Sequence, residues 1–148
     1  MKEENIKSLI RLGILRLKQK DLKKIKSLIN SAKLTAKVAK KIPLDEESAT
    51  LIFREIYESI RQLGEARWFS SGYEVQSGPG SHEISLESLK EMDIKEKLKL
   101  NTLDRFIKIR NDANYEGFII SVSQAKEIIE FWNKCGQEIT EILLKELK

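Results

Sequence analysis

The stretch FIKIRNDANYEG, residues 106–117, concentrates side chains that could do chemistry. A run with apolar, helical spacing ends at Arg110, and Asn111, Asp112, Asn114 and Tyr115 follow at once. An arginine guanidinium binds phosphate through a planar fork of N–H donors, which a lysine cannot offer. The cluster therefore allows two interpretations, a site that handles RNA or the polar end of a helix.

The purely structural interpretation of this stretch is also sound. Arg110 near the C-terminus of a helix interacts favourably with the helix dipole. Asn111 or Asn114 tolerates the left-handed conformation that ends many helices, and Gly117 can then turn the chain while Tyr115 packs. These residues alone leave both interpretations open.

His82, the one histidine, lies in GPGSHEISLESL at the exit of a glycine-containing loop. Histidine suits acid–base work because its pKa lies near neutrality. However, His82 is 28 residues from Arg110 in the sequence, and its position also suits the entry or cap of a helix. It is a candidate catalytic residue with a structural alternative.

The sequence lacks other common catalytic and binding motifs. The chain has neither G-x-x-x-x-G-K-[ST] nor G-x-G-x-x-G, and no Glu-x-x-His pair. One histidine and one cysteine make neither a metal site of nitrogen and sulfur ligands nor a Cys–His dyad, unless Cys135 and His82 meet. We expect no metal site and no cofactor, and Cys135, in a helical pattern, is predicted to be a core residue.

The elements that must position these residues are helices. Apolar residues recur at steps of three and four almost throughout, with no alternating strand of any length. The prediction is an all-α antiparallel bundle of five to six helices in one domain, residues 1–148. Its expected parts are a basic helical pair at about 3–42, a helix from Asp45 to about Trp68, one long loop near 72–84, a short helix from Ser85, a helix over about 95–112, and a last helix from Ser121 or Ser123.

Two local signals mark helix starts. Asp21 can cap the second helix, and SVSQ, residues 121–124, resembles a capping box.

Charge is distributed unevenly along the chain. Residues 1–43 carry 13 lysines and arginines against three acidic residues, whereas the whole chain has a net charge of only +4. A basic segment on an acidic body suggests contact with a polyanion or an acidic partner, and the alternative is a solvated lysine face. No signal peptide or membrane span is visible, so a soluble cytoplasmic protein is expected.

The order of these features resembles a known family. Arg110-x-x-Ala113-Asn114-Tyr115, then Ser121 or Ser123, Ala125 and an amphipathic helix, is similar to the HEPN domain (higher eukaryotes and prokaryotes nucleotide-binding). The stretch ARWFSSGYEVQSGPGSHEISLESL is similar to the region that precedes this motif in HEPN proteins, and the likeness covers roughly residues 45–145. HEPN proteins are small α-helical bundles found in prokaryotic toxin–antitoxin and defence systems.

The resemblance implies a function. Catalytic HEPN proteins are metal-independent endoribonucleases in which a histidine follows the arginine after four to six residues, but here Tyr115 and Gly117 stand at those two spacings. A tyrosine with a pKa near 10 is a poor base at neutral pH. The subgroup with Arg-x-x-Ala-Asp-Tyr fits better, with Asn114 in place of the aspartate, and its members look like non-catalytic nucleotide-binding modules beside a minimal nucleotidyltransferase.

The resemblance also implies a homodimer in which two copies of Arg110 face one cleft and bind a nucleotide or RNA phosphate. Tyr115 would stack on a base, and Asp112 or Asn114 would orient the arginine. Three hypotheses follow. The first is this binding or partner module, acting with a nucleotidyltransferase or in a toxin–antitoxin system. The second is a metal-independent endoribonuclease that uses Arg110 with a nonstandard base, His82. The third is a helical interaction module whose basic segment binds an acidic partner.

Overall fold

The computed structural model describes every residue from Met1 to Lys148 and shows the all-α bundle that the sequence predicts. Its helices are α1 (Glu3–Arg11), α2 (Leu22–Lys41), α3 (Ala49–Ser70), α4 (Ser81–Glu87), the 3-10 helix η1 (Lys97–Thr102), α5 (Leu103–Tyr115), α6 (Val122–Phe131), the π-helix η2 (Trp132–Gly136) and α7 (Gln137–Glu146). Two short strands, β1 (Leu15–Leu17) and β2 (Tyr73–Val75), complete it. No helix is long and apolar enough to cross a lipid bilayer.

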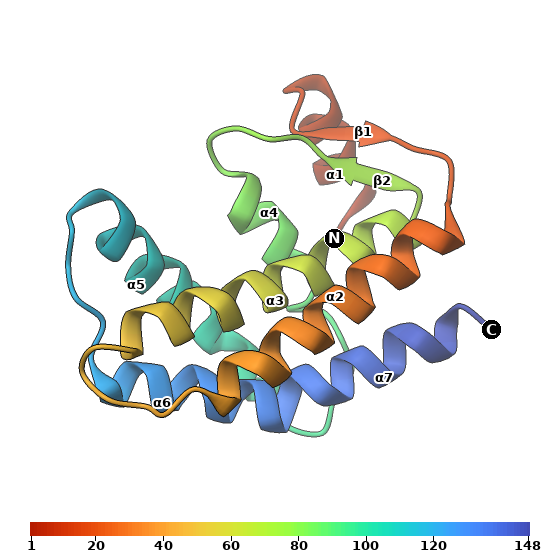
Figure 1. Ribbon diagram of the computed structural model, residues 1–148. Helices are drawn as coiled ribbons and strands as arrows, with labels where there is room; N and C mark the ends of the chain where they lie inside the picture. The colour runs from red at the N-terminus through yellow and green to blue at the C-terminus, as the bar shows by residue number, and fades with distance from the viewer.

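The centre of the bundle is the antiparallel pair α2 and α3, which lie side by side (Figure 1). Helices α6 and α7, joined without a break by η2, run along this pair, and α4 and α5 pack on α3 and on each other. The arrangement leaves one side of α2 uncovered. It also places the segment that connects β2 to α5, which contains α4, beside α3.

Amphipathic spacing explains why α2 and α3 pair. The predicted apolar stripes are buried in both helices, except that Leu22 at the start of the α2 stripe is exposed, and the α2 stripe ends in three alanines at intervals of three and four residues. Small side chains let two helix backbones approach closely, and larger ones on α3 fill the space between them. The buried members of the two predicted stripes are Ile25, Ile29, Ala32, Ala36 and Ala39 on α2 and Ala49, Ile52, Phe53, Ile56, Ile60, Leu63 and Trp68 on α3.

Both predicted helix-start signals are confirmed. The side chain of Asp21 accepts a hydrogen bond from the backbone N–H of Lys24. Ser121 and Gln124 form a capping box, in which each side chain bonds the backbone N–H of the other residue. Such caps satisfy backbone donors that the first turn leaves free.

The N-terminal segment differs from its prediction, because the expected helical pair at 3–42 is a short helix, a strand and a long helix. Gly13, with φ of +76°, ends α1. The N–H groups of Gly13 and Ile14 then return to the carbonyls of Ile10 and Leu9, which is the Schellman pattern. The chain beyond it pairs as β1 with β2, Leu15 opposite Val75, and buries Leu15.

Other boundaries also differ from the prediction. The helix expected from Asp45 begins as α3 at Ala49, and the side chain of Asp45 accepts from the backbone N–H groups of Glu47 and Ser48 in the turn before it. The long loop predicted near 72–84 contains β2, and α4 begins at Ser81 rather than Ser85. The helix predicted over 95–112 starts as η1 and continues as α5 to Tyr115, three residues beyond the expected end. Cys135 is fully buried, as predicted, within the π-turn that interrupts the last helix.

Candidate functional site

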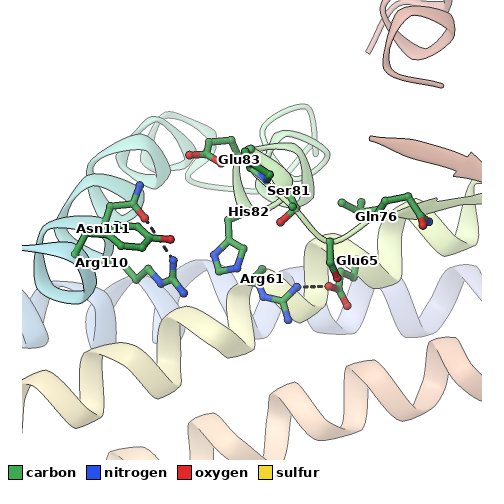
Figure 2. Close-up of a pocket in the computed structure, with 14 residues that line it drawn as sticks. Arg61, Glu65, Gln76, Ser81, His82, Glu83, Arg110 and Asn111 are labelled. Carbon is green, nitrogen blue, oxygen red and sulfur yellow. Dashed lines mark hydrogen bonds and ion pairs between the residues drawn. The ribbon is translucent and has the colours of Figure 1, made fainter. Parts of the chain in front are cut away.

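A cavity of about 650 Å³ opens between the middle of α3, the loop after β2, the start of α4 and the end of α5 (Figure 2). It brings together His82 and Arg110, which the sequence left 28 residues apart. A third cation, Arg61 of α3, also lines it. The full lining is Arg61, Glu65, Val75, Gln76, Ser77, Gly78, Pro79, Gly80, Ser81, His82, Glu83, Arg110, Asn111 and Tyr115.

Close packing of α4 on α3 positions His82. A Cβ at Gly64 of α3 would lie 2.1 Å from the carbonyl oxygen of Ser85, so only glycine allows this approach. The indole N–H of Trp68 donates to the carbonyl of Ile84 at 2.8 Å. The hydroxyl of Ser88 lies 2.9 Å from the carbonyl oxygen of Ser85 and 3.1 Å from that of Gly64, and its proton is shared between these two acceptors. These contacts set the place from which the side chain of His82 enters the cavity.

Tyr57 packs against the ring of His82 and is within hydrogen-bonding distance of it. The two rings lie 5.8 Å apart at their centroids, and the tyrosine hydroxyl is 3.4 Å from Nδ1 of His82. Tyr57 is 2% exposed, and His82 is the one hydrogen-bond partner of its hydroxyl within the chain. A buried hydroxyl must donate its proton to an acceptor or lose that bond. We therefore assign Tyr57 as the donor and Nδ1 as the acceptor.

This assignment decides what the imidazole offers to a ligand. A neutral histidine that accepts at Nδ1 carries its proton on Nε2. Burial, together with the positive charges of Arg110 and Arg61, lowers the pKa of His82, which favours the neutral ring. His82 then presents an N–H donor at Nε2, and no free lone pair on that atom.

Arg110 is the cation in the cavity that has no carboxylate partner. Its guanidinium carbon lies 5.8 Å from the ring centre of Tyr57, on the ring face, and Nη1 donates to Oδ1 of Asn111 at 3.4 Å. Neither neighbour neutralises its charge. In Figure 2 the imidazole of His82 lies between the side chains of Arg110 and Arg61. A half-buried arginine that has no carboxylate partner and only one hydrogen bond keeps most of its N–H donors available for an anion.

Arg61, in contrast, is fully paired. Its Nε donates to Oε2 of Glu58 at 2.9 Å, while its two terminal nitrogens contact Glu58 and Glu65. Bonds to these carboxylates raise the pKa of Arg61 above its ordinary value. Arg61 is not recognisable as a site residue from the sequence, because Glu58, Arg61 and Glu65 at spacings of three and four look like ordinary ion pairs on a helix surface.

Of the remaining predicted site residues, one lines the cavity and two do not. Tyr115 lines its edge and is 76% exposed, so its ring is free to contact a ligand. Asp112 and Asn114 lie outside the lining, and Asp112 pairs with Lys108 at 3.0 Å instead. The amide next to Arg110 is that of Asn111. Asp112, two positions on, points to the other side of α5, whereas Asn114 lies one turn on from Arg110, near the end of the helix, and is exposed.

No group of three or more histidine, cysteine, aspartate or glutamate side chains is placed to hold a metal ion. The cavity offers hydrogen-bond donors and the unneutralised charge of Arg110, together with the carboxylate of Glu83, which forms no ion pair within the chain. The donors around Arg110 suit an anion with several acceptor oxygens. Comparison of the chain with protein-family models, with curated proteins and with solved structures gives no match.

Proposed function

We propose that the cavity around Arg110 binds a phosphate group of RNA or of a nucleotide. The observation that carries the proposal is the half-buried guanidinium of Arg110, unpaired and beside the N–H donor of His82. Arginine binds phosphate oxygens through two parallel N–H bonds, which suits an anion better than a single lysine charge does. Tyr115, exposed at the edge of the same cavity, is available to stack on a base.

The proposal extends to the kind of module. We infer a non-catalytic HEPN-type protein of the Arg-x-x-Ala-Asp-Tyr subgroup, with Asn114 in place of the aspartate, because the all-α bundle and the position of Arg110 near the end of α5 agree with that resemblance. A cytoplasmic homodimer, in which two copies of Arg110 face one cleft, belongs to this proposal. So does service to a minimal nucleotidyltransferase or a toxin–antitoxin system.

A second candidate function is metal-independent RNA cleavage. The observation that favours it is the convergence of His82 and Arg110 in one cavity, where the histidine could move a proton and the arginine could stabilise the charge that develops on the phosphate. Activation of a ribose 2′-hydroxyl needs a nitrogen with a free lone pair. Because Tyr57 donates to Nδ1, the neutral ring offers N–H at Nε2, which favours binding over base catalysis.

The test measures binding and cleavage on the same samples. A fluorescein-labelled oligouridylate is titrated with the protein in buffer containing a chelator, with ATP as competitor, and the RNA is then run on a gel. Arg110→Ala is expected to weaken binding about tenfold or more, since it removes a charged bidentate contact. Arg105→Ala is the matched control, because Arg105 lies on the same helix, pairs with Glu127 and is not part of the cavity.

The outcomes separate the two candidates. Binding that Arg110→Ala weakens, without RNA cleavage, is the result expected of a binding module. Cleavage that is lost in both Arg110→Ala and His82→Ala would establish the nuclease instead. Equal binding by wild type, Arg110→Ala and Arg105→Ala would exclude the cavity as the phosphate site.

A further inference from the structure

The uncovered side of α2 combines strong positive charge with exposed apolar residues. The helix carries seven lysines and no acidic residue. On the side away from the core, Leu34 is 62% exposed and Val38, one turn later, is 51% exposed. Because these two apolar side chains are one turn apart, they add a small contiguous apolar surface to the lysine face.

This face forms one wall of a groove. A cavity of about 480 Å³ lies between α2 and α7. Lys33 and Lys37 stand on its α2 side, and neither forms an ion pair within the chain. Leu34 and Leu144 contribute apolar surface from the two helices. Glu141 is the one acidic residue in the lining.

The floor of the groove contains Trp132, which is 3% exposed and sits at the first position of the π-turn. A Cβ at Gly136 would lie 2.5 Å from the Trp132 ring, so the glycine makes room for the indole. π-turns within helices are rare and occur frequently at functional sites.

The indole N–H of Trp132 lacks a partner within the chain, whereas that of Trp68 donates to the carbonyl of Ile84. Among fully buried side-chain polar atoms only Oε1 of Gln62 is unpartnered. The Trp132 N–H is therefore not fully buried and remains available to an acceptor. A groove with apolar sides, a cationic edge and a free donor is complementary to an apolar ligand that also carries carboxylates.

We propose that the groove between α2 and α7 docks an acidic amphipathic helix of a partner protein. An amphipathic helix lays its apolar stripe into such a groove, while aspartates and glutamates beside the stripe meet Lys33 and Lys37. The α2 wall from Asn30 to Lys40 is about 15 Å long, the length of about three helical turns. Nucleic acid fits less well, because the lining has no arginine and places leucines where a phosphate backbone would lie.

The peptide that serves as the binding probe is obtained by selection from a random library. Helix-forming peptides of about four turns, with random side chains, are displayed and selected on the whole protein, and the most enriched one is labelled with fluorescein. The expected peptide is acidic and amphipathic, and its binding weakens as salt is raised. Binding should also change the intrinsic fluorescence of Trp132. This fluorescence change should be absent in Trp132→Phe.

Two groove variants test the site. Lys33→Glu/Lys37→Glu reverses the cationic edge, and Leu34→Ser removes exposed apolar surface, so neither disturbs the core. Each is expected to weaken peptide binding about tenfold. The matched control is Lys23→Glu/Lys26→Glu, which makes the same charge change on exposed residues of α2 outside the groove. Arg110→Ala should leave peptide binding unchanged, which keeps this test independent of the phosphate cavity.

Several results would overturn the proposal. These are selected peptides without acidic bias, or peptide binding that the groove variants and the control weaken equally. Oligouridylate binding that Lys33→Glu/Lys37→Glu abolishes, with no peptide selected, would assign the face to nucleic acid. A dimer in sedimentation experiments that Leu34→Ser dissociates, again with no peptide selected, would assign it to a second copy of the chain.

Discussion

The hydroxyl of Tyr57 lies 3.4 Å from Nδ1 of His82 and has no other hydrogen-bond partner in the chain. This relationship joins a buried residue of α3 to the first turn of α4 and selects the tautomer of the imidazole. It also explains why a histidine beside an arginine need not act as a base. In the proposed phosphate site, the donor on Nε2 would bond to a phosphate oxygen.

Tyr57→Phe removes that hydroxyl while keeping the ring. We expect nitrogen NMR of the wild type to show His82 protonated at Nε2 and unprotonated at Nδ1, and the variant to show exchange between both tautomers. Oligouridylate binding should weaken about threefold to tenfold, the effect of one poorly oriented hydrogen bond. A wild-type spectrum with the proton on Nδ1 would contradict the assignment. Nε2 would then have a free lone pair and could act as a general base.

The pH dependence of binding follows from His82. Burial and the neighbouring arginines lower its pKa in the free protein, and a bound phosphodiester anion would raise that pKa again. The complex then binds more protons than the free protein between these two pKa values. Affinity should therefore rise as the pH falls through this window, by at most about tenfold per unit.

The measurement is oligouridylate affinity between neutral and mildly acidic pH, with His82→Gln beside the wild type. The other charged groups that face His82 are Arg61, Arg110, Glu58 and Glu83, and they remain in the variant. A flat profile is expected for His82→Gln. Wild-type affinity that falls on acidification would show that His82 does not contact the anion.

Glu65→Gln tests the charge balance of the cavity. Glu65 lines the cavity and contacts Arg61, so its carboxylate both repels an incoming anion and occupies one donor of the arginine. The amide removes the negative charge and should strengthen phosphate binding about threefold. Glu130→Gln, in a surface pair with Lys134 outside the cavity, serves as the control and should have no effect.

Gly64→Ala tests how α4 is held. The new Cβ would lie 2.1 Å from the carbonyl oxygen of Ser85, a backbone atom that can move only with α4. We expect the free energy of unfolding to fall by about 1 to 3 kcal/mol, despite the better helix propensity of alanine. Phosphate binding should weaken as well, because His82 moves with α4.

Thermal unfolding followed by circular dichroism measures the first effect of Gly64→Ala, and oligouridylate titration measures the second. Ser88→Ala is the comparison, since it removes the hydroxyl shared by the Gly64 and Ser85 carbonyls without adding an atom between the helices. An unchanged melting temperature together with unchanged binding would mean that the close approach does not set the position of His82.

The amides near Arg110 should differ in their effects. Asn111→Ala removes the one oxygen bonded to the guanidinium and is expected to weaken phosphate binding about threefold. Asn114→Ala changes an exposed residue outside the cavity on the same helix and should leave binding unaltered. A larger loss in Asn114→Ala than in Asn111→Ala would favour the arrangement that the HEPN resemblance implies, in which Asn114 orients the arginine.

Local features of this protein could be predicted from the sequence. The buried stripes of α2 and α3, the Asp21 cap and the capping box at Ser121 depend on residues within a few positions of one another, so periodicity and residue type determine them. Gly13 is a residue type that often ends a helix, but the regular spacing of apolar residues on both sides of it predicted a longer first helix.

Tertiary structure alone decided the site and the strands. β1 pairs with β2 across more than 50 residues, and the cavity joins Arg61, His82 and Arg110 from three helices. No single stretch of sequence predicts these long-range contacts, because they depend on how closely whole helices pack. The close packing of α3 and α4, for example, requires the glycine at position 64. The sequence identified Arg110 as a candidate, and the packing of α4 and α5 on α3 supplied its neighbours.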